Sequence, residues 1–64
     1  MKVLNTFQKD GFVINHIKYN SPTFGGFYAV EITVDDIIVY EKDGLNLDAS
    51  LEVYLKKCNE LKSK

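Results

Sequence analysis

The sequence contains no arginine, no tryptophan, one cysteine and one proline. A lone cysteine, Cys58, cannot form a disulfide within the chain or supply a cysteine-rich zinc site. Secreted domains of this size usually depend on several disulfides, so we expect a cytoplasmic protein. No apolar run approaches the roughly 20 residues of a membrane-spanning helix, and the first residues lack the apolar core of a signal peptide. We therefore expect no association with a membrane.

The absence of arginine also bears on the choice of partner. Arginine is the main side chain that grips phosphate and guanine through paired hydrogen bonds. Eight lysines remain, but acidic residues offset them to a net charge of −1. Nucleic-acid binding is therefore disfavoured.

The length of 64 residues predicts one small domain, residues 1–64. A domain of this size buries only about 60% of the surface that its unfolded chain exposes. Since disulfides cannot reinforce so small a core, self-association or a partner protein is the natural substitute.

The chain is predicted to form an α+β domain, with an antiparallel sheet of three or four strands and one C-terminal helix on one face. Asp10-Gly11 is a strong signal for a hairpin turn, and residues 12–19 and 27–34 have the apolar alternation of strands. Asp35-Asp36 is predicted to turn the chain into a last strand over 37–41. Residues 20–26 have the composition of a loop, and residues 1–10 are compatible with a strand or a helix.

The C-terminal segment shows helical periodicity after Asp48, which is the predicted N-cap. One apolar stripe is expected to pack on the sheet. It consists of Leu47, Leu51, Tyr54, Leu55, Cys58 and Leu61.

One helix cannot cover both faces of such a sheet. A two-residue turn at 35–36 would place Val39 opposite Ile32 on the helix side, leaving Phe27, Ile38 and Tyr40 on the other face. Exposed apolar surface of this kind usually marks an interface. The alternative is that the N-terminal segment covers it, and a change of one residue in loop length would exchange the two faces of the last strand.

No combination of residues in the sequence predicts a reaction. His16 has no catalytic or ligating partner near it in sequence and is expected to be an ordinary strand histidine. Cys58 is expected to be a buried apolar residue rather than a nucleophile. We therefore expect no catalytic residue, no cofactor and no metal.

Gly25-Gly26 lacks the pattern of a phosphate-binding loop. It is expected to be a flexible connection or, alternatively, a mobile lip with Phe24 and Phe27 as aromatic anchors.

Charge is distributed unevenly along the chain. Residues 1–30 carry +2, residues 31–52 carry −6 and residues 53–64 carry +3. The acids of the middle segment could form a rim that attracts a basic partner or imitates a phosphate backbone. The alternative is that they are turn and cap residues that keep the sheet edges soluble. The predicted interface consists of Phe24, Phe27, Ile38, Tyr40, Asp35, Asp36, Glu41 and Asp43.

In size and character the whole chain, lysine-rich, free of arginine and acidic in the middle, resembles small bacteriophage proteins that block host enzymes or defence systems. The small Hachiman inhibitors are of this kind. No motif carries the resemblance, so no functional residues transfer from it. It implies a non-enzymatic inhibitor, often a homodimer, that binds and occludes a host nucleic-acid-processing enzyme. The alternative is a small single-stranded nucleic-acid-binding domain with Phe12, Tyr19, Phe27, Tyr28 or Tyr40 stacking on bases.

Overall fold

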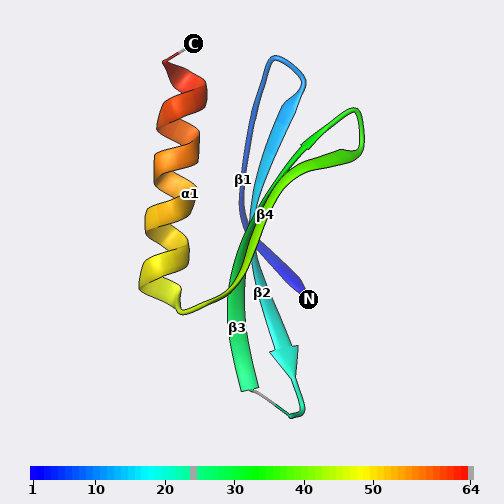
Figure 1. The fold of residues 1–64 in the computed structure, drawn as a ribbon, viewed down its shortest axis with the longest axis vertical. Helices are drawn as coiled ribbons and strands as arrows, with labels where there is room; N and C mark the ends of the chain where they lie inside the picture. Colours follow the sequence, from blue (N-terminus) through cyan, green and yellow to red (C-terminus); the bar gives the residue numbers. More distant parts are fainter. Residues whose placement is uncertain (24, 64) are drawn as a thin grey trace.

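The computed structural model describes residues 1–23 and 25–63, and the α+β arrangement predicted from the sequence is confirmed. Four strands form one antiparallel sheet in the order β1-β2-β3-β4, and a single helix, α1, lies against one face (Figure 1). The elements are β1 (Lys2–Lys9), β2 (Phe12–Ser21), β3 (Gly25–Val34), β4 (Ile37–Leu45) and α1 (Leu47–Lys62). The N-terminal segment is thus an edge strand and does not cross the face of the sheet opposite the helix.

Tight turns set the register of two of the hairpins. Asp10-Gly11 joins β1 to β2, and Asp35-Asp36 joins β3 to β4, as the sequence predicts. All four of these residues have positive φ, from 52° at Asp35 to 82° at Gly11. This backbone conformation matches the right-handed twist of the flanking strands.

The connection between β2 and β3 is shorter than the predicted loop over 20–26. Pairing continues to Ser21 opposite Gly25, so Asn20 and Gly26 are strand residues. Gly25 has φ of +74°, a conformation that an L side chain rarely adopts. Phe24, a predicted interface residue, lies outside the described residues.

A β-bulge in β4 changes which side chains face the helix. Val34 pairs with Ile37 as predicted. Thr33 then pairs with Ile38 and Ile32 with Tyr40, so Val39 is an extra residue of β4 between Ile38 and Tyr40. The prediction that Tyr40 shares a face with Phe27 and Ile38 is therefore wrong. The bulge shifts the alternation by one residue, so Tyr40 turns to the helix side.

The N-cap of the helix lies two residues before the predicted one. Asn46 is the N-cap, and its side-chain oxygen accepts a hydrogen bond from the backbone N–H of Ala49 at 2.7 Å. Asp48 lies instead in the first turn, where its charge favours the positive end of the helix dipole.

Only part of the predicted apolar stripe is buried. Tyr54, Cys58 and Leu61 pack on the sheet, and Ser50 joins them. Leu47, Leu51 and Leu55 form an exposed row, here called the leucine ridge. The predicted stripe therefore divides into a row that faces the sheet and a row that faces solvent.

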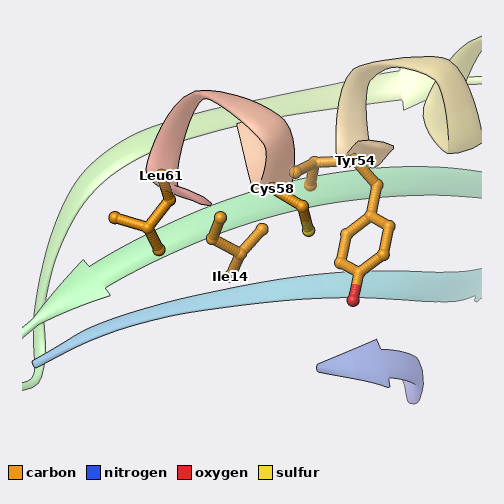
Figure 2. Packing of buried hydrophobic residues seen from close by; sticks show 5 residues of the cluster. Ile14, Tyr54, Cys58 and Leu61 are labelled. Atoms are coloured by element: carbon orange, nitrogen blue, oxygen red, sulfur yellow. The ribbon is translucent and has the colours of Figure 1, made fainter. Parts of the chain in front are cut away.

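The core lies between the helix and the two central strands. Ile14 of β2 and Val30 of β3 meet Tyr54, Cys58 and Leu61 of the helix, and the side chains are shown together in Figure 2. Each is at most 9% exposed. Strand alternation accounts for this set, because Ile14 and Val30 belong to the same face of the sheet.

The outer face of the sheet, opposite the helix, is crossed by a polar row. Thr6 donates a hydrogen bond to the side chain of Asn15 at 2.9 Å, and Asn15 donates to Glu31 at 3.3 Å. Beyond this row, Tyr19 stacks on Phe27 with ring centroids 5.1 Å apart. The outer face is therefore not one continuous apolar surface.

Candidate protein-binding surface

The two long sides of the helix differ. On the β1 side, the Lys9 ammonium donates hydrogen bonds to the backbone carbonyls of Leu61 and Lys62, at 3.1 and 3.2 Å. The Lys62 ammonium lies 5.2 Å from the centre of the Phe7 ring. A cation beside the last carbonyls is favoured by the helix dipole. We call this side the closed flank.

A buried hydrogen-bonded chain connects β1, β2 and the helix. The Nε2 atom of His16 lies 2.8 Å from the Ser50 hydroxyl, and its Nδ1 atom lies 3.2 Å from the Asn5 amide nitrogen. The Ser50 hydroxyl donates to the Leu47 carbonyl at 2.9 Å. The hydroxyl therefore accepts from His16, which places the ring proton on Nε2 and leaves Nδ1 to accept from Asn5.

This chain has the geometry of a structural element. His16 and Ser50 are at most 1% exposed, so no substrate reaches the hydroxyl, and its proton is committed to a backbone carbonyl. Tyr54 stacks on the imidazole with centroids 5.6 Å apart. Burial lowers the pKa of His16 below its ordinary value, so the neutral ring is the favoured form. Sequence spacing could not identify these partners, because strand pairing and helix docking bring them together.

On the opposite side the helix leaves a groove, which defines the open flank. The helix packs on β1, β2 and β3, and β4 projects beyond it. The groove has a volume of about 190 Å³ and is lined by the apolar side chains Phe12, Ile14, Ile32, Val39 and Leu61, with Lys57 and Glu60 completing its lining. The side chains of Lys57 and Glu60 are partly exposed, so they stand at its mouth.

The two charged residues at the groove mouth bind each other. The Lys57 ammonium lies 3.3 Å from a carboxylate oxygen of Glu60 and 4.4 Å from the centre of the Tyr40 ring. The positive charge is thus engaged from two sides within the molecule. Burial, followed by the Cys58 thiol beside it, raises the pKa of Tyr54 to about 12.

The tip of the β3–β4 hairpin, residues 35–39, combines acids with exposed apolar side chains. Ile37, Ile38 and Val39 are 66%, 54% and 57% exposed. Val39 belongs to the groove, and Ile37 lies on the same face as Phe12 because both pair with Val34. Groove and tip therefore form a continuous surface.

The turn residues of this tip are unusual for their backbone conformation. Asp35 and Asp36 both adopt left-handed φ, at 52° and 66°, where glycine is the residue with the lowest conformational cost. Strained residues of this kind are often retained for function. The tip thus presents two carboxylates beside apolar surface at a cost in stability.

The residues of the predicted interface fall into separate regions. Asp35, Asp36 and Ile38 belong to the tip, and Tyr40 lies on the helix side beneath Lys57. Phe27 lies on the outer face, stacked on Tyr19.

Glu41 and Asp43 form an acidic region on the outer face together with Glu31. Glu41 is paired directly with Glu31 on β3. Burial, followed by the charges of Glu31, Glu41 and Asp43, raises the pKa of Tyr19, which places these acids near one another. Like charges directly opposite in a sheet are destabilising.

Sequence reasoning missed most of the groove. Alternation in β3 predicts that Ile32 lies on the helix side, but Phe12 and Ile14 of β2 are predicted only as strand residues, with no face assigned. The bulge at Val39 and the displacement of the helix toward β1 open the surface. Neither feature has a recognisable signal in the sequence.

The aromatic residues considered for base stacking already have neighbours. Lys18 lies 5.9 Å from the centre of the Tyr28 ring, and Lys57 covers Tyr40. Tyr19 and Phe27 stack on each other, and Phe12 lines the groove. A base would have to displace these contacts before it could stack.

The described residues contain neither a cluster of metal ligands nor a membrane-spanning helix. Among residues 1–23 and 25–63, no three His, Cys, Asp or Glu side chains gather as metal ligands would. In the same part of the chain, no helix combines the length and apolar character needed to span a bilayer. Cys58 is a free thiol in the core, as the helical stripe predicts.

Comparison of the chain with known protein families, with curated proteins and with solved structures gives no significant match. The surface geometry therefore carries the functional argument by itself.

Proposed function

We propose that this protein is a non-enzymatic protein-binding module that uses the open flank to dock on a partner. The observation that carries the proposal is the exposure of Ile37 and Val39 beside an apolar groove and two acidic residues. Apolar surface that adjoins a concave site is typical of protein interfaces. None of the three leucines of the leucine ridge contributes to the lining of this groove.

The partner that we propose is a larger enzyme that processes nucleic acids, which the protein inhibits by occlusion. Such enzymes present basic surfaces to phosphate, and the carboxylates of Asp35 and Asp36 beside the open flank have the complementary charge. A 64-residue chain is large enough to cover such a surface.

A homodimer is the second part of the proposal, and the leucine ridge supports it. The ridge runs along the first half of the helix, where Asp48 and Glu52 are acidic, whereas Lys56 and Lys62 make the second half basic. Two helices related by a two-fold axis through Leu51 run antiparallel, so the three leucines of each helix meet those of the other, and Lys56 lies beside the acidic first turn of the other helix.

The test compares paired variants in affinity capture from a bacterial lysate and in sedimentation. The double variant Ile37→Asp/Val39→Asp should lose the captured protein, whereas Leu51→Asp/Leu55→Asp should retain it and sediment as a monomer. Both pairs alter exposed side chains, so the fold should survive, which circular dichroism checks. Equal capture by both variants would contradict docking through the open flank.

A sedimentation coefficient that is monomeric for the wild type at micromolar concentration would contradict the homodimer alone. Retention of single-stranded DNA, weakening as salt rises, would support the nucleic-acid-binding alternative instead.

A further inference from the structure

We propose that the groove between α1 and β4 is a receptor for one apolar side chain of a partner segment that carries lysine or arginine beside it. This inference rests on the proposed protein-binding function, and it adds the chemistry of the segment that is bound. The groove supplies the apolar contact, and the acidic turns around it supply the charge.

The size of the groove selects a single side chain. Its volume of about 190 Å³ exceeds the roughly 30 Å³ of a water molecule and is close to the roughly 150 Å³ of an apolar cavity that accepts benzene. Sites for drug-sized ligands and cofactors occupy about 300–1,000 Å³. A leucine, isoleucine or phenylalanine side chain therefore fits, and a larger cofactor does not.

The lining of the groove favours an apolar group. Phe12, Ile14, Ile32, Val39 and Leu61 present hydrocarbon, and the two charged residues of the lining are bound to each other. No buried side-chain polar atom of the described residues lacks a hydrogen-bond partner, so nothing inside the groove calls for a polar ligand atom. An aliphatic or aromatic group would gain about 25 cal/mol for each Å² removed from water.

The charges around the groove select the flanking residues of the segment. Asp35 and Asp36 follow directly after Val34, which is the strand partner of Phe12, and Asp10 lies in the turn just before Phe12. Glu60 and Lys57 at the mouth neutralise each other. Lys9, the strand partner of Phe12, offsets Asp10. Asp35 and Asp36 leave the surroundings net negative, and they attract a basic segment and repel an acidic one.

Nuclear magnetic resonance with short probe peptides tests this inference. The first probe is an acetylated, amidated pentapeptide with leucine between two lysines. It should shift the amide signals of Ile32, Val39 and Leu61, with a dissociation constant on the order of 1 mM. Replacing its leucine by alanine should weaken binding about tenfold, because most of the buried hydrocarbon is lost. Replacing its lysines by glutamates should abolish binding.

Two protein variants make the test specific to the groove. Val39→Phe fills the groove from an exposed position and should abolish the shifts, whereas the matched change Leu51→Phe on the leucine ridge should leave them unchanged. Glu60→Lys replaces a negative by a positive charge at the mouth without filling the groove. It should lower the affinity for the lysine peptide and allow the glutamate peptide to bind.

Failure of this inference can be told apart from failure of the proposed function. If neither the lysine peptide nor the glutamate peptide shifts the groove amide signals, or if these two peptides bind equally well, the groove is not this receptor. Should Val39→Phe then still capture a protein that Ile37→Asp/Val39→Asp loses, the open flank remains an interface, and only its assigned ligand is wrong. If the wild type captures no protein either, both proposals fail.

Discussion

The closed and open flanks of the helix receive different support from the same sheet. On the closed flank, Lys9 holds the last helical turn, and Asn5, His16 and Ser50 connect two strands to the first turns. On the open flank, Lys57 covers Tyr40, but apolar side chains of β4 remain exposed next to the groove. The contrast is between a side stabilised by buried polar contacts and a side available to a partner.

Elementary dimensions account for the contrast. A helix with its side chains is about 10 Å across, whereas strands lie about 4.8 Å apart. One helix therefore covers two or three strands and cannot cover four. Because contacts to Lys9 and His16 draw α1 toward β1, the uncovered strand is β4.

The largest difference between the flanks should appear when isoleucines are truncated. Ile14→Ala should lower the free energy of unfolding by about 3 kcal/mol, because a 1% exposed side chain leaves a cavity. Ile37→Ala, at 66% exposure, should change it by less than about 0.5 kcal/mol. Urea denaturation measures both. Similar losses for the two variants would mean that the tip is part of the core.

Acidification should weaken the closed flank next. Because burial lowers the pKa of His16, the folded state favours the neutral ring, and this contribution is fully present above the ordinary value of 6.5. It is lost as the pH falls below 6.5, with a slope of at most about 1.4 kcal/mol per pH unit. Urea denaturation between pH 7.5 and 5.5 measures the slope.

The control for the pH experiment is His16→Asn, which keeps a polar side chain but cannot titrate. Its stability should be lower and independent of pH over that window. The groups that contact the ring are Asn5, Ser50, Tyr28 and Tyr54. Asparagine and serine do not titrate, and burial raises the pKa of Tyr54 to about 12, far from this window. An unchanged slope in the variant would assign the pH dependence to another group.

The two hairpin turns provide a smaller comparison. Gly11→Ala should destabilise the protein by about 1 kcal/mol, because alanine is strained at φ of +82° although no atom would meet its Cβ. Asp36→Gly should stabilise it by up to about 1 kcal/mol for the converse reason. Thermal denaturation measures both effects. Destabilisation by Asp36→Gly would show that the carboxylate supports the turn.

The smallest effect concerns the acids of β4. Glu41→Lys should stabilise the protein by about 0.5 kcal/mol at low salt, since it replaces a like-charge pair with Glu31 by an opposite one. The gain should shrink as salt is added. Asp43→Lys is the matched control, because Asp43 is not paired with an acid in the register. An equal gain in the control would indicate a general reduction of negative charge.

Local sequence signals predicted most of the fold. Apolar alternation and the turns at Asp10-Gly11 and Asp35-Asp36 predict the strands, and helical spacing predicts α1. The N-cap was missed because Asn46 and Asp48 are both good caps by composition, and only the backbone conformation decides between them.

The candidate surface was less predictable. The bulge at Val39 depends on how β4 fits the twist of β3, which alternation does not report. The partners of His16 are 11 and 34 residues away in sequence and meet only after the sheet and helix assemble. Exposure of the leucine ridge likewise depends on how far the helix extends over a strongly twisted sheet.

The order of strands in the sheet has a consequence for how the chain assembles. Every strand pairs with its neighbour in sequence, so each hairpin can close a short loop on the microsecond timescale. The contacts from Lys9 to Leu61 and Lys62 join residues 52 and 53 positions apart, and they can form only when the helix docks. We expect these contacts to form late in folding. The backbone amide hydrogens of the last helical turn should then be the first to exchange, so this turn should report the earliest opening of the native protein.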